Sequence, residues 1–571
     1  MKLHKILMVA GIGATLMLSS CYDLDRNPDY QVSSGTFFQT EEHAKQAMMG
    51  TYSIMRSDNV YGLFFGWDCL GGISRGYDNP SFQTIQRGTV SVTNSWFSNK
   101  WSACYEGIAR SNNVLQNIDN VDMSEELKNR YRGEARFMRG LYYFHLLSFF
   151  GGVPIYDESW IVGEKYAEML LPRNTEDEVR AFILDDFTAA AAVLPASWDA
   201  ANYGRATSGA AIALKGRVLL FAKRYQEASQ CFSQVINSGE YQLYPNYPDL
   251  FTPTGDQSSE MVFAIQNQGG TGQEYGMPMC FYLGSRSSFG SCWNNVEAAT
   301  TFVDEFEWAD GRPFDWEEVF PGYTTDSNLR KEIWFSELNS AKNAVIEYTP
   351  YKEQLLEMYD KRDPRMQQQI ILPYTHYIGW SKAKATDHEY VLADGMGIPA
   401  DYGMIRTNDN NDVYLWRKFV PEGDMNGGIT NRSHTPINYA IVRYADVLLM
   451  QAECLNELGD QAGAVALVNQ VRARSNMPGI NSGPSWLAAN SHDEVFDRIK
   501  HERRIELACE GHSYFDMKRW GLLETLNGVS ERTVSLSKST YTRKVTERDY
   551  YWPIPSGEID KNESLTQNPG W

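Results

Sequence analysis

The stretch from Ile441 to Gly459 constrains the fold of this chain more than any other. Its sequence, IVRYADVLLMQAECLNELG, predicts a helix with apolar residues on nearly every side. Such a helix packs inside a larger helical body, and its charged residues make it unsuited to span a membrane. Arg443 and Asp446, three residues apart, are predicted to pair as buried charges, and Gly459 is the expected left-handed stop. The chain is therefore predicted to be largely helical.

Other segments repeat this helical pattern. Gly216, Ala228 and Phe232 have the 12- and 4-residue spacings of a tetratricopeptide repeat. Small residues at the first two positions let two antiparallel helices approach, and Phe232 is expected to fill the next layer. Ala464 and Val468 repeat the last two positions after the Ile441 helix. We therefore predict that the two helix pairs belong to one helical layer.

Several helix starts can also be predicted from the sequence. Thr175-x-x-Glu178 and Ser491-x-x-Glu494 are capping boxes, in which each end residue bonds the backbone of the other. Thr40 is predicted to cap a further helix, and the residues from Ser124 to Phe150 read as a long apolar helix.

Between these helical regions the pattern changes. Residues 241–436 are rich in Gly, Pro, Asn, Asp and aromatics, with brief apolar strands such as Met261 to Ile265. A structureless insertion of that length is implausible in a compact protein, so we predict an irregular α/β subdomain. Residues 59–94 are predicted to form a glycine-rich loop that carries aromatics.

Charge and aromatic content narrow the classes of ligand. The 571 residues carry a formal net charge of −20, which argues against nucleic acid and anionic lipid headgroups as partners. Fifteen Trp and 33 Tyr residues could supply a sugar-binding surface, although most of them are expected to lie in the core.

The N-terminus predicts export. A basic start and a short apolar run from Ile6 to Leu18 precede Cys21, and the run is too short for a membrane span. Small residues before Cys21 resemble the bacterial lipobox, in which the thiol takes a diacylglycerol anchor; the alternative is an ordinary signal peptide. Asp23 and Asp25 resemble the acidic tether of surface lipoproteins in Bacteroidota.

Seven further cysteines remain, so at least one thiol is unpaired within the chain. Cys280 and Cys292 bracket a short loop and could pair in an oxidising compartment. There is no C-x-x-C and no zinc-ligand spacing.

No set of catalytic residues is recognised in the sequence. The chain has no H-E-x-x-H, dinucleotide-binding or P-loop pattern. Acidic pairs such as Glu317-Glu318 do not converge on a helix, whereas a glycosidase needs two carboxyls facing one another across a cleft. The mixed charges from His501 to Glu506 are predicted to form ion networks. No enzymatic activity is predicted.

Five motifs, in order along the chain, resemble the SusD/RagB family, the surface glycan-binding lipoproteins of Bacteroidota. They are EARFMRGLYYFHLLSFFGGVPI, YDKRDPRM, RYADVLLMQAECLNELG, HERRIELACEGHSYFDMKRWG and YYWPIPSGEID…NPGW. The resemblance implies four tetratricopeptide-like helix pairs supporting a variable ligand face. It also implies a SusC-like TonB-dependent transporter as partner, over which the protein closes as a lid.

The predicted organisation follows from these signals. Its parts are a lipoprotein signal peptide (1–20), a lipidated tether (21–39), an N-terminal helical region (40–240) containing the loop 59–94, a variable ligand-facing subdomain (241–436), and a C-terminal helical region (437–571).

Candidate glycan-binding residues lie in aromatic, glycine-bearing segments. A sugar presents a flat C–H face that stacks on an aromatic ring, and its hydroxyls need polar partners at the rim. The candidates are Trp67, Arg75, Tyr77 and Asp78 in Gly66–Pro80, Tyr282, Arg286 and Trp293 in Cys280–Trp293, and Trp380 as a weaker third point. Each aromatic could instead be a core residue.

The predicted function is non-enzymatic capture of an oligosaccharide or polysaccharide at the outer-membrane surface and its delivery to the transporter. Capture of peptides is the alternative, and a helical scaffold without a small ligand is a third reading. No cofactor is predicted; neither is a structural calcium ion, because no Asp/Asn loop has convincing ligand spacing.

Overall fold

The computed structural model describes residues 37–165, 168–270, 275–395, 403–407 and 412–571. The predicted signal peptide (1–20), the predicted lipidation residue Cys21 and the tether up to residue 36 lie outside the described residues.

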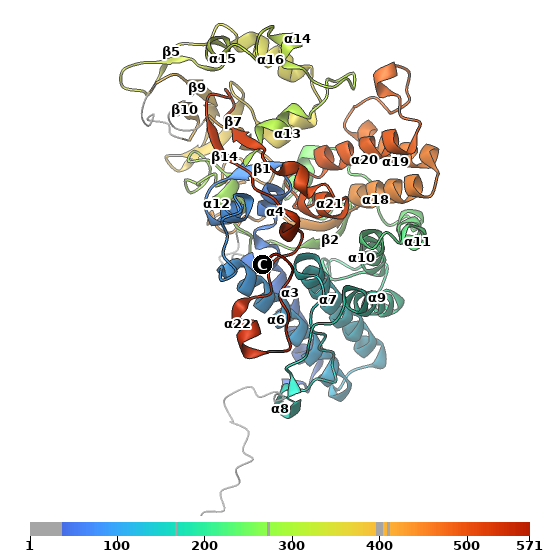
Figure 1. The fold of residues 1–571 in the computed structure, drawn as a ribbon. Helices are drawn as coiled ribbons and strands as arrows, with labels where there is room; N and C mark the ends of the chain where they lie inside the picture. The colour runs from blue at the N-terminus through green and yellow to red at the C-terminus, as the bar shows by residue number, and fades with distance from the viewer. Residues whose placement is uncertain (1–36, 166–167, 271–274, 396–402, 408–411) are drawn as a thin grey trace, which may run out of the picture.

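Long helices form a continuous scaffold that sweeps along one side of the molecule in Figure 1. From α6 to α19, each of these helices packs against the next one in the chain. No helix among the described residues is long and apolar enough to cross a membrane. The scaffold helices are α3 (Glu41–Ser53), α6 (Ser95–Asn117), α7 (Glu125–Phe150), α9 (Glu176–Val193), α10 (Ser208–Phe221), α11 (Tyr225–Asn237), α18 (Tyr444–Glu457), α19 (Gln461–Arg474) and α20 (His492–Glu506).

Shorter helices lie between the long ones and after α20. They are α4 (Phe64–Leu70), α5 (Gln83–Gln86), α8 (Val162–Lys165), α12 (Met279–Leu283), α13 (Thr300–Asp304), α14 (Trp316–Val319), α15 (Ser327–Trp334), α16 (Lys352–Asp360), α17 (Arg365–Gln369), α21 (Ser513–Arg519) and α22 (Ser556–Lys561).

The strands of the described residues form small two-stranded sheets, parallel for β9 with β10 and antiparallel for the others. The pairs are β1 (Ser74–Gly76) with β3 (Val296–Ala298), β2 (Met261–Ile265) with β12 (Tyr439–Arg443), β4 (Glu337–Leu338) with β5 (Val345–Glu347), β6 (Ile370–Ile371) with β11 (Leu415–Trp416), β7 (His376–Ser381) with β8 (Lys384–Glu389), β9 (Val391–Ala393) with β10 (Ile405–Thr407), and β13 (Ser530–Arg532) with β14 (Ser539–Thr542). The prediction of a mostly helical fold with an irregular α/β portion is confirmed.

The predicted helix starts are correct. Thr175 with Glu178, and Ser491 with Glu494, each form both reciprocal bonds of a capping box. The Thr40 side chain accepts from the backbone N–H of His43 at the start of α3. These bonds satisfy backbone donors that have no partner inside a helix.

The predicted tetratricopeptide-like contact is present between α10 and α11. A Cβ atom on Gly216 would lie 2.7 Å from the Phe232 ring, so only glycine allows this close approach. On its other side α11 packs against α18, and the Gln451 side chain donates to the hydroxyls of Ser229 and Ser233 at 3.0 and 3.1 Å. The two helix pairs therefore belong to one layer, as predicted.

The predicted helix from Ile441 was wrong at its start. Residues 441–443 belong to strand β12, in which Tyr439 pairs with Ile265 and Arg443 with Met261. Helix α18 begins at Tyr444 and is therefore about 21 Å long. The left-handed stop is correct, since Gly459 has a φ of +88°.

The predicted pairing of Arg443 with Asp446 is also wrong. Because Arg443 lies in a strand and Asp446 in the first turn of a helix, their side chains point to different partners. Arg443 binds the carboxylates of Glu260, Glu506 and Glu510 at 2.7–2.8 Å. Asp446 instead forms ion pairs with two other arginines, Arg217 and Arg503.

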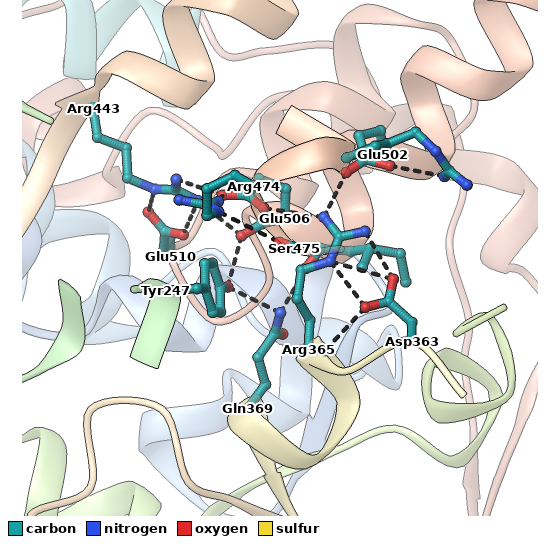
Figure 2. A network of polar contacts seen from close by, with 12 residues as sticks. Tyr247, Asp363, Arg365, Gln369, Arg443, Arg474, Ser475, Glu502, Glu506 and Glu510 are labelled. Atoms are coloured by element: carbon teal, nitrogen blue, oxygen red, sulfur yellow. Dashed lines mark hydrogen bonds and ion pairs between the residues drawn. The ribbon is translucent and has the colours of Figure 1, made fainter. Parts of the chain in front are cut away.

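A buried charge network joins the helices to the middle of the chain (Figure 2). Arg365 of α17, within the predicted variable region, binds Glu502 and Glu506 of α20. Arg474 of α19 binds Glu506 as well, and Glu260, just before β2, completes the group through Arg443. The expected ion network is confirmed, and it fixes the middle region to the scaffold.

The same network predicts acid sensitivity. Burial alone would raise the pKa of the Glu506 and Asp446 carboxyls, but surrounding arginines hold the pKa of both well below its usual range. Unfolded carboxyls titrate near pH 4, so their stabilising contribution is present above about pH 4 and is lost as the pH falls below it.

We expect the melting temperature to fall steeply below about pH 4. Burial raises the pKa of Asp256 to about 7, so this group acts in the opposite sense and destabilises the fold as the pH rises from about 4 to 7. Thermal melts from pH 8 to pH 3 test both signs, and a melting temperature that stays constant below pH 4 would contradict the first.

Candidate functional site

The two predicted aromatic segments meet at the β1–β3 sheet. Ser74 lies opposite Ala298, and Gly76 lies opposite Val296. Position 76 requires glycine, because a Cβ atom there would lie 2.2 Å from the carbonyl oxygen of Asn295. The pairing places the residues that follow β1 beside the residues that precede β3.

Tyr77 and Trp293 are exposed at this junction, with 37% and 41% of their surfaces accessible. The Tyr77 hydroxyl donates to the Trp293 carbonyl oxygen across 216 residues of sequence. The Trp293 ring centroid lies 4.9 Å from that of Phe281, which lies 4.8 Å from that of Tyr282. We call Tyr77, Phe281, Tyr282 and Trp293 the aromatic ridge.

Two arginines flank the ridge. The guanidinium carbon of Arg286 lies 5.7 Å from the Trp293 ring centroid, and that of Arg432 lies 4.5 Å from the Phe281 ring centroid. These distances are within the range of cation–π attraction. Arg432 also donates to the Gly290 carbonyl oxygen at 2.7 Å, so it holds the loop that carries the ridge.

That loop, residues 280–292, closes on itself. The Trp293 N–H donates to the Phe281 carbonyl oxygen, and the Cys292 N–H to the Ser285 carbonyl oxygen, both at 2.9 Å. The Sγ atoms of Cys280 and Cys292 lie 3.3 Å apart as two free thiols. Phe281 and Tyr282 of the ridge therefore lie on a short, internally bonded loop, which Trp293 follows directly.

Two further predicted residues lie at this loop or beside the ridge. The Trp380 ring is half-buried and lies 5.5 Å from the Phe289 ring, and its backbone N–H donates to the Ser287 carbonyl oxygen at 2.6 Å. Asp78 is exposed, with the Asn295 amide nitrogen 3.5 Å from its carboxylate. The structure thus brings together Tyr77, Asp78, Tyr282, Arg286, Trp293 and Trp380 from three segments.

Trp67 does not belong to this surface, and the prediction of an exposed platform there is wrong. The residue lies in helix α4, is 3% exposed, and packs edge-on against Phe149 and Phe515 at 5.6 and 5.4 Å. A buried ring cannot stack on a sugar. The uninterrupted apolar run from Leu63 to Phe65 was the sequence signal for burial that the glycine content obscured.

Arg75 is likewise not a polar rim residue. It is 3% exposed in strand β1, and its guanidinium is 3.0 Å from the Glu297 carboxylate. Side chains two residues apart share a face along a strand, but the strand ends at Gly76 and the chain turns at Asp78, whose φ is +62°. Arg75 therefore stays inside while Tyr77 reaches the surface.

The expectation that the chain contains no hydrolase G-x-S-x-G pattern is wrong at the level of sequence. Residues 72–76 read GISRG and match G-x-S-x-G, the nucleophile-elbow pattern of hydrolases. That motif requires a serine exposed at a turn from a strand into a helix. Ser74 instead lies within β1, is fully buried, and pairs with Ala298. The match therefore carries no catalytic geometry.

Sequence reasoning also missed Phe281, Phe289 and Arg432. The two phenylalanines lie inside the predicted Cys280–Trp293 segment and were passed over in favour of tyrosine and tryptophan. Arg432 is about 140 residues away in sequence, and no local signal connects it to the loop.

A larger hollow lies elsewhere. A groove of about 1190 Å³ lies between α6, residues 154–162 with 169–170, and α22; helices α6 and α22 are drawn below α12 in Figure 1. Tyr105 and Tyr156 line it, but their hydroxyls donate to the carbonyl oxygens of Pro154 and Met169 at 2.8 and 2.7 Å. These polar groups fasten the chain rather than face a ligand. We therefore place the candidate site at the aromatic ridge.

The described parts of the chain hold no candidate metal centre. No group of three or more His, Cys, Asp or Glu side chains among them is placed to hold a metal ion.

Comparison with known proteins agrees with this architecture. The chain is 24% identical to SusD-like protein P25 of Formosa agariphila, over 97% of this chain and 96% of the relative. It superposes with a TM-score of 0.74 on a SusD-like protein of Bacteroides fragilis at 24% identity, covering 96% of this chain and 100% of the other. A SusD-like carbohydrate binding protein of the same species gives a TM-score of 0.73 at 25% identity, covering 93% and 100%.

The fold defines a helical-repeat scaffold that carries an aromatic ridge on its loops. The sequence model described as the SusD family matches residues 259–571, and that described as starch-binding associating with outer membrane matches residues 24–220. This chain belongs to the SusD family.

Proposed function

We propose that this protein captures an oligosaccharide or polysaccharide at the cell surface and performs no bond chemistry on it. The observation that carries the proposal is the meeting of Tyr77 and Trp293, exposed and hydrogen-bonded to one another from segments far apart in sequence. Exposed rings are costly to keep in contact with water, and their association on one surface suits a flat apolar partner.

The ridge has the parts that sugar recognition needs. Trp293 and Tyr77 offer ring faces to the C–H face of a pyranose, while Arg286 and Asp78 offer a donor and an acceptor for its hydroxyls. The carbohydrate-binding description of one relative and the starch-binding description of one family model support the same ligand class.

The cellular setting is part of the proposal. Residues 1–20 would direct export, a diacylglycerol on Cys21 would anchor the tether (21–39) to the outer membrane, and the helical regions (40–240 and 437–571) would support the ligand-facing residues 241–436. A SusC-like TonB-dependent transporter would receive the glycan. The family description "associating with outer membrane" supports the location.

Affinity electrophoresis and isothermal titration against a broad panel of glycans test the proposal, with a panel of peptides run beside it. Retention by at least one glycan, with no new reducing ends after prolonged incubation, is the expected result. Binding of peptides without any glycan would replace the proposal with peptide capture. Release of sugar products would show an enzyme instead. Binding of neither class would favour a scaffold without a small ligand.

A further inference from the structure

We propose that Cys280 and Cys292 form a disulfide in the exported protein, which closes the loop that carries the aromatic ridge. Both side chains are fully buried, and their Sγ atoms lie 3.3 Å apart. The inference rests on the proposed function in one respect, namely that export brings the chain into an oxidising compartment.

The surroundings of the two thiols form a separate small cluster. Cys280, Cys292 and Ile429 form a cluster separate from the main hydrophobic core, with Phe289 and Met425 packed against it, and Met425 also contacts the main core. Both thiols are also within reach of one acceptor, the Phe289 carbonyl oxygen, at 3.7 and 3.2 Å. Among the cysteines of the described residues, this is the thiol pair whose sulfur atoms are in contact.

Burial sets the time at which the bond can form. Contact with Cys292 and burial together raise the pKa of the Cys280 thiol well above its usual value, and a protonated, enclosed thiol is a poor nucleophile. The bond would therefore form during folding, before the loop packs against Ile429 and Met425.

The oxidant required is a protein disulfide of a thiol oxidase in that compartment. The thiolate of one cysteine attacks a sulfur of that disulfide, which forms a mixed disulfide and expels the oxidant's second sulfur as a thiolate. The other cysteine then attacks the mixed disulfide, which forms the Cys280–Cys292 bond and releases the oxidant as a dithiol. Two electrons pass to the oxidant, whose two thiols carry the two protons lost by the chain.

The bond would act on the ridge by limiting the freedom of the loop. Phe281, Tyr282 and Arg286 lie between the two cysteines, and Trp293 follows directly. Without the bond, loop closure depends on backbone hydrogen bonds such as Trp293 N–H to Phe281 carbonyl oxygen and on Arg432. A covalent closure removes conformations of the free loop and holds the rings ready for a ligand, which lowers the cost of binding.

The test uses full-length protein exported by its own leader and purified without reductant. Free thiols are alkylated under denaturing conditions, and unreduced peptides are mapped by mass spectrometry. The expected result is a linked pair of peptides containing Cys280 and Cys292, lighter by two hydrogen atoms than the reduced pair. Alkylation of both residues in the exported protein would overturn the inference.

Thermal melting provides a second measurement. A bridge across this short loop predicts that dithiothreitol lowers the melting temperature of the natural protein by about 3 °C. It predicts no such shift in the Cys280→Ser/Cys292→Ser variant, while the matched control Cys231→Ser keeps the shift. Equal melting of the natural protein with and without reductant, when alkylation shows that the reductant has freed both thiols, would contradict a stabilising bridge. Neither measurement requires a ligand, so failure of glycan binding leaves this inference standing, and two free thiols would leave the proposed function standing.

Discussion

Substitution of Arg443 by methionine should destabilise the protein by a large fraction of its total stability. Arg443 is fully buried and binds the carboxylates of Glu260, Glu506 and Glu510. Methionine fills much of the same volume but leaves three buried carboxylates short of a cation. Removal of one partner from a buried ion network costs about 3–5 kcal/mol, against a typical total stability of about 5–15 kcal/mol.

Chemical denaturation at pH 7 measures this loss. Arg312→Met is the matched control, because Arg312 also binds two carboxylates, Asp310 and Glu318, but lies at the surface; its substitution should leave stability nearly unchanged. The difference between the two variants isolates the effect of burial.

The pH dependence of the Arg443→Met variant gives an independent check. Without the cation, the pKa of the neighbouring buried carboxyls should rise. At pH 8 these carboxyls would be charged without a partner, whereas at pH 5 they could be protonated. The loss of stability should therefore be larger at pH 8 than at pH 5. A variant that unfolds at the same denaturant concentration as Arg312→Met would show that the network does not hold the middle region to the scaffold.

The second large effect is expected on binding. Trp293→Ala should weaken capture of the glycan found by the panel by at least about 30-fold, the equivalent of about 2 kcal/mol for the loss of a central aromatic anchor. The substitution removes the most exposed ring of the ridge and the surface on which a pyranose would stack. Isothermal titration measures the change in Kd.

Trp486→Ala is the control for this experiment. Trp486 is 39% exposed, close to the 41% of Trp293, but its indole N–H donates to the Asp310 carbonyl oxygen, away from the ridge. Its substitution should not change glycan affinity. Tyr77→Phe should have an intermediate effect, because it keeps the ring and removes only the hydrogen bond to the Trp293 carbonyl oxygen.

Two results would show that the ligand does not bind at the aromatic ridge. Normal affinity in Trp293→Ala, with unchanged melting, would remove the ridge from the binding surface. If Tyr156→Ala then abolished binding, the groove beside α6 would become the site. Tyr156 is half-buried, and its hydroxyl holds the neighbouring segment through the Met169 carbonyl oxygen. The melting temperature of the Tyr156→Ala variant therefore has to be compared with that of the natural protein as well.

Local signals predicted the scaffold well because they depend on neighbours in sequence. Both capping boxes have the predicted pairs of bonds, and α7 ends at Phe150, the predicted end of that helix. The residues 441–443 were misassigned for the opposite reason. Their apolar character suits a buried strand as well as a buried helix. They form a strand because they pair with β2, about 180 residues earlier in the chain.

The candidate site likewise depends partly on local sequence signals and partly on long-range packing. Aromatic residues on glycine-bearing segments led to the prediction of Tyr77, Tyr282 and Trp293, and the structure brings these three residues to one ridge. Trp67 belongs to an equally glycine-rich segment, yet the packing of α4 against α21 and α7 residues buries it. Composition alone does not separate an exposed ring from a buried one.

The sequence by itself determined the helical class, the helix caps, the close contact at Gly216 and the membership of a family. These properties arise from periodicity, local hydrogen bonding and long collinear motifs. Tertiary structure alone decided which carboxylates surround Arg443, that Arg432 reaches the 280–292 loop, and that Tyr77 meets Trp293. Each of these depends on contacts between residues far apart in the chain, whose geometry is set by packing of the whole core rather than by the identity of neighbouring residues.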